Sequence, residues 1–175
     1  DTKYRGDIYL YDSERDSFMM ALKALGYSMN TENEAELQDA YNWLVECVQT
    51  MKPEIVTDEI IDNMAQGRKA LGLCYSGDAA YIMSENENMG YYLPEGGTNL
   101  WYDSMVIPAN AKNVELAHEF INFISSYDYA YDNSSYVGYT SPNQEVIDEL
   151  SGEGGDYEEI NAYLPRTDNP NDEVF

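Results

Sequence analysis

Three short stretches of the sequence combine carboxylates with aromatic or hydroxyl side chains. They are residues 12–16 (DSERD), 75–78 (YSGD) and 101–103 (WYD). Each stretch offers an acid, and two of the three pair it with an aromatic ring. The face of such a ring attracts a cation, and a carboxylate accepts charge-assisted hydrogen bonds from N–H groups. Together the three stretches predict a site for an alkylammonium compound.

Each acid in these stretches also has an ordinary structural explanation. Asp12, Ser13 and Glu14 precede a predicted helix, where such residues cap the N-terminus or interact with the helix dipole. Asp78 would likewise be an acid in the first turn of a helix. Carboxylates gathered in one cleft repel one another. Their cluster therefore costs free energy in the empty protein, and a bound cation would relieve that cost.

The composition agrees with a cationic ligand and excludes other classes of partner. The chain has 175 residues, 33 acidic and 9 basic side chains, and a net charge of −24. Such a charge repels nucleic acids and anionic membrane surfaces, so we predict no nucleic-acid partner. The single histidine, His118, excludes a His-pair metal site, and two cysteines cannot form a disulfide scaffold. We therefore expect no metal and no cofactor.

The hydrophobic pattern predicts strands that alternate with helices. Such alternation is typical of an α/β protein with a largely parallel sheet flanked by helices. In such sheets ligands bind beyond the carboxyl ends of the strands, which points to Tyr11–Asp16, to Tyr75–Asp78 and to the loop or strand around Trp101–Asp103. Trp101 and Asp103 would face the same side of an extended segment. Strands are expected at 7–11, 70–75, 90–93 and 100–107, and helices at 13–25, 31–51 after a Thr31/Glu34 capping box, 57–65, 76–82, 113–124 and 143–150.

Four blocks of sequence, in order along residues 5–145, carry a family resemblance. Two are specific: WYDSMVIPANA at 101–111 and GYTSPN at 138–143. The others are DSERDSF at 12–18 and LCYSGDA at 73–79. These blocks resemble the spermidine/putrescine-binding proteins of bacterial ABC importers. The resemblance implies a type II periplasmic binding-protein fold, in which two lobes close like a hinge on a polyamine.

The resemblance also implies ligand-binding roles for seven residues. Trp101 would stack on the ligand's chain, and Asp103 would bind an amine. Tyr75 stands where the family usually has Trp, and Asp16 stands where Glu is common. The other three implied contacts are Asp78, which matches an acid of putrescine-type members, Tyr139, which matches a tyrosine that reaches the ligand, and Ser13, which stands where some members have Asp.

By the same resemblance, the chain is a fragment without the N-terminal lobe of such a protein. Residues 1–102 would form the core of the second, C-terminal lobe. Residues 103–140 would be the hinge strand and the segment that crosses to the missing lobe, and 141–175 a truncated return segment. The implied partners are a polyamine, the permease subunits of an ABC importer and the missing N-terminal lobe. The implied location is outside the cytoplasm, periplasmic or at the cell surface, with no catalysis.

Two alternatives stay open from the residues themselves. Tyr75 and Ser13 depart from the family pattern, which leaves another small amine, an amino acid or a sugar as the ligand of the same fold. Asp78 and Asp103 could instead be the carboxylate pair of a glycosidase, which would need a carbohydrate cleft. Nothing else in the sequence supports that reaction.

Overall fold

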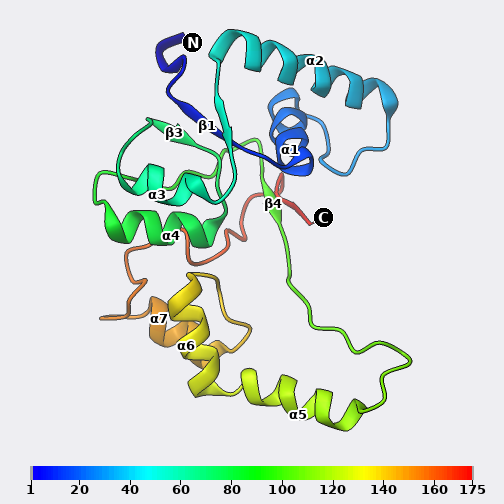
Figure 1. The fold of residues 1–175 in the computed structure, drawn as a ribbon, viewed down its shortest axis with the longest axis vertical. Helices are drawn as coiled ribbons and strands as arrows, with labels where there is room; N and C mark the ends of the chain where they lie inside the picture. Colours follow the sequence, from blue (N-terminus) through cyan, green and yellow to red (C-terminus); the bar gives the residue numbers. More distant parts are fainter. Residues whose placement is uncertain (1, 175) are drawn as a thin grey trace.

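A three-stranded parallel sheet organises the first half of the chain (Figure 1). The structure, a computed structural model, describes residues 2–174. The sheet has the order β2-β1-β3, with β1 (Ile8–Tyr11) between β2 (Glu54–Val56) and β3 (Leu71–Gly72). The predicted parallel arrangement is confirmed, and it follows from helical connections that return the chain to the same end of the sheet.

Four helices cover this sheet (Figure 1). α1 (Glu14–Leu25) and α2 (Glu34–Met51) join β1 to β2 and pack against each other. α3 (Glu59–Ala65) joins β2 to β3, and α4 (Ser76–Glu85) follows β3 and packs against α3. The connection from β1 to β2 and the connection from β2 to β3 run in opposite directions along the sheet. Because both connections are right-handed, α1 and α2 lie on one face of the sheet and α3 lies on the other.

Local sequence explains where these helices begin and end. The Ser13 hydroxyl caps α1 by accepting the Asp16 backbone N–H at 3.3 Å. Gly26 ends α1 in the left-handed conformation, with φ 80°. The predicted capping box at Thr31 is wrong: Asn33 caps α2 and accepts the Ala35 N–H at 2.9 Å. The Thr31 hydroxyl bonds Glu36 instead.

The main core lies between the sheet and the helices α3 and α4. Tyr9, Ile60, Met64 and Ile82 form this cluster of buried side chains. Ile60 and Met64 close on Gly72, where an added Cβ would lie 3.1 Å from each side chain. Burial of such side chains stabilises the domain by about 1.5–3 kcal/mol each. This packing fixes the carboxyl ends of β1 and β3 relative to α4.

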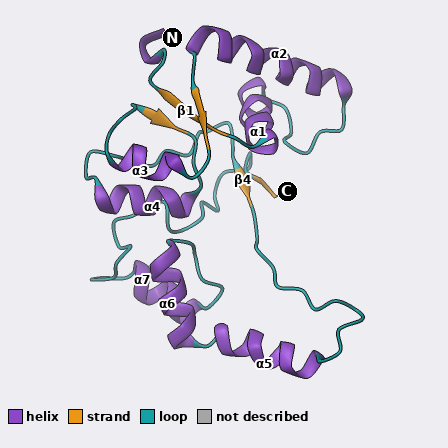
Figure 2. Cartoon of the chain, viewed as in Figure 1, coloured by secondary structure: helices purple, strands orange, loops and turns teal. Residues whose placement is uncertain are grey.

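The second half of the chain is helical and more open (Figure 2). β4 (Asn99–Leu100) and β5 (Glu173–Val174) form a separate, short parallel pair. After β4 the chain runs without a partner strand to α5 (Val114–Ile124). α6 (Tyr127–Val137) and α7 (Gln144–Ser151) follow and contact each other. Among the described residues, no helix is both long and apolar enough to cross a membrane.

Several predicted strands are absent or shorter than their patterns suggest. The run 70–75 contains only the two-residue β3, whose residues are exposed rather than buried. Residues 90–93 form a loop, and 100–107 pairs only at β4. An apolar run becomes a buried strand only if both faces are covered, and β3 is an edge strand here. The strand β2 and the helix α6 were not predicted.

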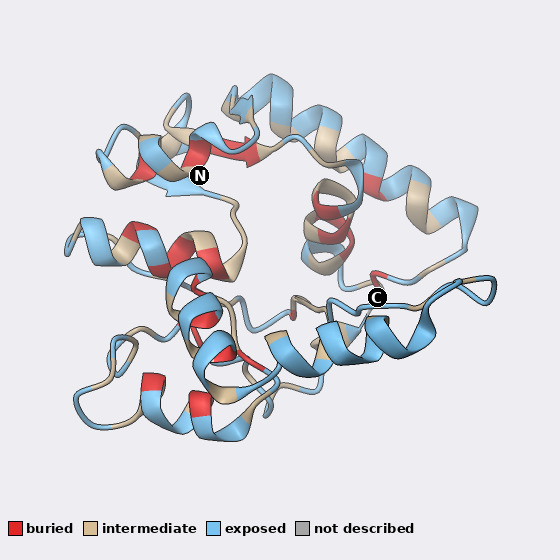
Figure 3. Cartoon of the chain, turned by 60° about the horizontal axis from the view of Figure 1, so that its bottom comes forward, coloured by how far each residue is buried: buried red, intermediate tan, exposed pale blue. Residues whose placement is uncertain are grey.

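The helix α5 is a surface element in this structure (Figure 3). It begins at the predicted cap, where the Asn113 side chain accepts the Leu116 N–H at 3.4 Å. No residue of α5 is buried, and Leu116 and Phe120 are 56% and 58% exposed. The helix belongs to the segment 103–140 that the resemblance assigns to an interlobe crossing. That division of the chain stays a prediction.

Candidate ligand-binding site

Four aromatic rings contact one another in series at the carboxyl end of the first sheet; we call them the ring array. Tyr11 meets Tyr75 with ring centroids 4.9 Å apart, Tyr75 meets Trp101 at 5.8 Å, and Trp101 meets Tyr139 at 6.0 Å. All three contacts are edge-to-face, the geometry that aromatic quadrupoles favour. The array leaves ring faces available to a cation.

The ring array borders a hollow of about 720 Å³. That volume falls in the range of small-molecule sites. The structure brings five of the seven predicted residues to its lining: Asp16, Tyr75, Trp101, Asp103 and Tyr139. Ser13 and Asp78 lie outside the lining. The carboxylates of Asp78 and Asp103 therefore do not share this hollow, as the glycosidase alternative would require.

Asp16 and Tyr75 form the buried edge of the site. The Tyr75 hydroxyl donates to the Asp16 carboxylate at 2.9 Å, and Asp16 is only 8% exposed. Burial and this hydrogen bond raise the pKa of Tyr75 to about 12. The hydroxyl consequently stays protonated at neutral pH and keeps donating. Asp16 also lines the hollow, and a carboxylate has further lone pairs with which it can accept from a ligand.

Asp78 lies at the first turn of α4, beside the array but outside the hollow. Its carboxylate accepts the Tyr75 backbone N–H, which favours the charged form. Burial outweighs that bond and raises the pKa of Asp78, with a further contribution from the Asp58 charge. The pKa of Tyr139 is raised mainly by burial and next by the nearby Asp78 carboxylate. A cation close to these rings would favour the ionised Asp78.

Tyr139 packs closely against the backbone of α4, and two glycines make this close approach possible. Gly138 ends α6 with φ +73°, and an added Cβ there would lie 2.9 Å from the Gly77 carbonyl oxygen. A Cβ on Gly77 would lie 2.4 Å from the Tyr139 ring. The Ser134 hydroxyl bonds the Tyr139 carbonyl. Tyr139 is therefore seated directly on the start of α4.

Trp101 is held through the strand pair that precedes it. The β4 backbone pairs with β5, and Asp172 accepts the Thr98 N–H at 2.9 Å. Arg166 clasps Asp172 with two hydrogen bonds of 2.6 and 2.8 Å, and also donates to the Leu93 and Pro94 carbonyls. The Arg166 hydrogen bond lowers the pKa of Asp172. This ion pair ties the C-terminal segment to the approach of Trp101.

Asp103 is exposed and lies on the unpaired segment after β4. It lines the hollow together with Trp101, and nothing in the described chain covers it. The Ser13 hydroxyl caps α1 by accepting the Asp16 N–H. Within residues 2–174, no group of three or more His, Cys, Asp or Glu side chains is arranged to hold a metal ion. The polar groups that line the hollow include carboxylates, hydroxyls, the amides of Asn99 and Asn133, and the guanidinium of Arg166, which is paired with Asp172.

Sequence reasoning missed two members of the site. Tyr11 is not among the seven predicted contacts, although it ends β1 and belongs to the ring array. Asp58 accepts the Tyr11 hydroxyl at 3.1 Å. Asp58 follows β2, a strand that was not predicted. Had β2 been recognised, the rule about carboxyl ends of parallel strands would have pointed to Asp58.

Comparisons with known proteins bear on the family and the fold of the chain. The family model described as bacterial extracellular solute-binding protein matches residues 1–162. The spermidine/putrescine-binding periplasmic protein of Escherichia coli (strain K12) is 35% identical over 144 residues, which cover 81% of this chain and 40% of that protein. The chain thus spans about two fifths of the length of the curated relatives it matches.

Two solved structures share the whole of the described fold. A spermidine/putrescine ABC transporter substrate-binding protein from Streptococcus pneumoniae matches with a TM-score of 0.81 and 34% identity. A protein from Listeria monocytogenes described as a putative spermidine/putrescine ABC transporter matches with a TM-score of 0.83 and 38% identity. Each match covers 100% of this chain and 53% of the other. The fold class is therefore the α/β fold of these binding proteins.

Proposed function

This chain belongs to the bacterial extracellular solute-binding proteins, and we propose that it is the ligand-binding C-terminal lobe of a polyamine-binding protein of an ABC importer. Its location would then be outside the cytoplasm, and its partners a second lobe and the importer's permease. The names of its relatives support polyamines as the ligand class. The role is binding and delivery, with no chemical step.

The observation that carries the proposal is the ring array beside a carboxylate-lined hollow. A polyamine is a chain of methylenes that joins positively charged amines. The Trp101 and Tyr75 rings would stack on the methylenes, and Asp16 and Asp103 would accept hydrogen bonds from the amines. The chain's net charge of −24 attracts such a cation from a distance. Sugars and neutral ligands would gain nothing from that charge.

The proposed mechanism is capture followed by closure. Asp103 is exposed here and lines the hollow. A second lobe that closed over the hollow would bury the Asp103–ammonium contact and exclude water from it. A ligand held by both lobes shifts the open–closed equilibrium toward the closed state. The closed form would be the one delivered to the permease.

The test is calorimetry of the native protein containing this chain, with spermidine and putrescine. We expect binding, and we expect Asp103→Asn to raise the Kd about ten- to a hundredfold, because a hydrogen bond to a charged group contributes ~1.5–3 kcal/mol. The matched control is Asp39→Asn, an exposed acid on α2 whose bond from Tyr27 an asparagine oxygen can also accept. Absence of binding to either amine rejects the polyamine proposal. Binding that Asp103→Asn leaves unchanged rejects Asp103 as the ammonium contact.

A further inference from the structure

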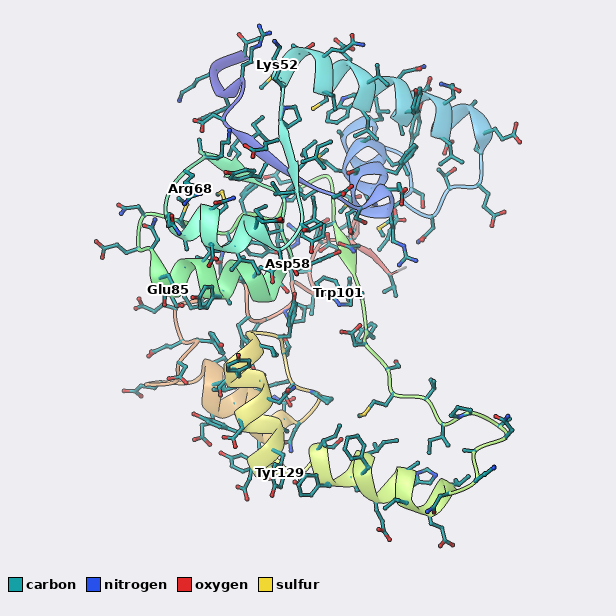
Figure 4. All side chains as sticks on the ribbon, in the orientation of Figure 1. Lys52, Asp58, Arg68, Glu85, Trp101 and Tyr129 are labelled. Atoms are coloured by element: carbon teal, nitrogen blue, oxygen red, sulfur yellow. The ribbon has the colours of Figure 1, made fainter. Side chains whose placement is uncertain are left out.

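Asp58 lies beside the ring array although it is far from Tyr11 in the sequence. β1 and β2 pair in parallel with Tyr11 opposite Val56, and the Asp12 N–H donates to the Val56 carbonyl at 2.8 Å. Both strands end at this register, so the residues that follow them emerge together. Figure 4 shows Asp58 near the middle of the molecule, in the same region as Trp101.

The Tyr11 ring is one wall of the hollow, and its hydroxyl is tied to Asp58. The hydroxyl donates to Asp58 Oδ1 at 3.1 Å. The same ring meets Tyr75 at 4.9 Å and 61°. Burial and the Asp58 hydrogen bond raise the pKa of Tyr11 to about 12, so the hydroxyl remains a donor across the neutral range. The hydrogen bond to Asp58 thus fixes the position of the Tyr11 hydroxyl, and the contact with Tyr75 fixes the orientation of the ring.

The Asp58 carboxylate has no competing structural task at the start of α3. Asp58 is the N-cap residue of this helix, yet its side chain makes no capping hydrogen bond. The Glu59 carboxylate instead accepts from the Thr57 N–H and hydroxyl at 3.1 and 2.7 Å. Asp58 therefore makes no capping bond and instead accepts from Tyr11, which is 47 residues away in the sequence. We take this hydrogen bond as the structural role of its carboxylate.

The neighbouring ring is held in the same way. Tyr75 donates to Asp16, and Tyr11 donates to Asp58, so two adjacent rings are each anchored by a carboxylate from another element. The Asp16 anchor is buried and the Asp58 anchor is exposed. An exposed hydrogen bond competes with water and is the weaker of the two. Asp58 therefore tunes the array rather than holding the fold together.

Resting on the proposed function, we propose that Asp58 is a positioning residue for polyamine binding. Its carboxylate holds the Tyr11 hydroxyl and so keeps the Tyr11 ring as a wall of the hollow, packed on Tyr75. Asp58 acts through this ring and makes no direct contact with the ligand. An acceptor at this position is what matters, and the charge is secondary.

The test measures spermidine binding to variants of the native protein. Asp58→Ala leaves the Tyr11 hydroxyl without its acceptor, and we expect the Kd to rise about three- to tenfold. Asp58→Asn keeps an acceptor oxygen and should restore near-normal affinity. Tyr11→Phe should match Asp58→Ala, and the double variant should be no weaker than either. Asp62→Ala, an exposed acid one turn along α3, is the control and should bind normally.

Two outcomes would overturn the positioning role. One is that Asp58→Asn lowers the affinity as much as Asp58→Ala does, and that the losses from Asp58→Ala and Tyr11→Phe are additive in the double variant. Asp58 would then act on the ligand through its charge. The other is that Asp58→Ala binds as tightly as the unmodified protein.

A ligand-free measurement separates this inference from the proposed function. In protein labelled with fluorotyrosine, Tyr11→Phe identifies the ¹⁹F NMR resonance of Tyr11. We expect that resonance to shift in Asp58→Ala and to stay near its place in Asp58→Asn. If the unmodified protein binds no polyamine, the proposed function fails while this result still reports on the anchor. A Tyr11 resonance that Asp58→Ala leaves unmoved overturns the positioning role.

Discussion

Replacing Gly77 by alanine tests how the ring array depends on backbone packing. The added Cβ would lie 2.4 and 2.6 Å from two carbons of the Tyr139 ring. Carbon atoms pack at about 3.5–4.0 Å, so the ring would have to move by about 1 Å. That movement would pull Tyr139 away from its edge contact with Trp101, now 6.0 Å between centroids.

Two opposing effects determine how much Gly77→Ala changes the free energy of unfolding. Overpacking of this kind costs ~1–3 kcal/mol. Alanine in place of glycine within a helix returns ~0.5–1 kcal/mol. We therefore expect Gly77→Ala to lower the free energy of unfolding by up to about 2.5 kcal/mol. Loss of one cation–π wall should raise the polyamine Kd about three- to thirtyfold.

The assay is denaturant unfolding followed by calorimetry with spermidine. Gly90→Ala is the control, because an added Cβ at that exposed glycine meets no atom within 4 Å. Within these 175 residues Trp43→Phe leaves Trp101 as the sole tryptophan, so a change in emission that appears with Trp101 and disappears in Trp101→Phe reports whether the array has moved. If Gly77→Ala matches Gly90→Ala in stability, affinity and emission, then close packing of Tyr139 on α4 does not organise the site.

Two further predictions concern the support of the site. The pKa of Asp172 is lowered by Arg166, so its contribution to stability is present above the unfolded-state pKa and is lost as the pH falls through the folded-state pKa. We expect the free energy of unfolding to fall on acidification below about pH 4, and we expect Asp172→Asn to make that fall less steep. Urea unfolding at several pH values measures both. If Asp172→Asn leaves the pH dependence unchanged, the ion pair does not have this role. Leu150 is fully buried between α6 and α7, and Leu150→Ala should cost about 2–5 kcal/mol by urea unfolding, whereas the 43% exposed Leu164→Ala should cost far less. Equal losses would contradict the packing of α6 on α7.

Local patterns in the sequence were sufficient for much of the fold. Alternating strands and helices predicted the parallel sheet, and the helices predicted at 13–25, 76–82 and 113–124 begin within one residue of those positions. These features depend on nearest neighbours along the chain, where capping groups and turns act. The short strand β2, the helix α6 and the exposure of β3 were not predicted, because pairing and burial depend on distant partners.

The site divides in the same way. The residue types alone indicated an organic cation, since rings and carboxylates at strand ends suit ammonium groups. The tertiary structure alone decided which of them meet. Asp16, Tyr75, Trp101, Asp103 and Tyr139 line one hollow together with Tyr11, whereas Asp78 and Ser13 lie outside it. Asp58 accepts the hydroxyl of Tyr11, the first ring of the array. Chemistry is a property of single side chains, and sequence states it directly. Proximity arises from strand register and from glycines such as Gly77 that allow close contact, and these exist only once the chain is folded.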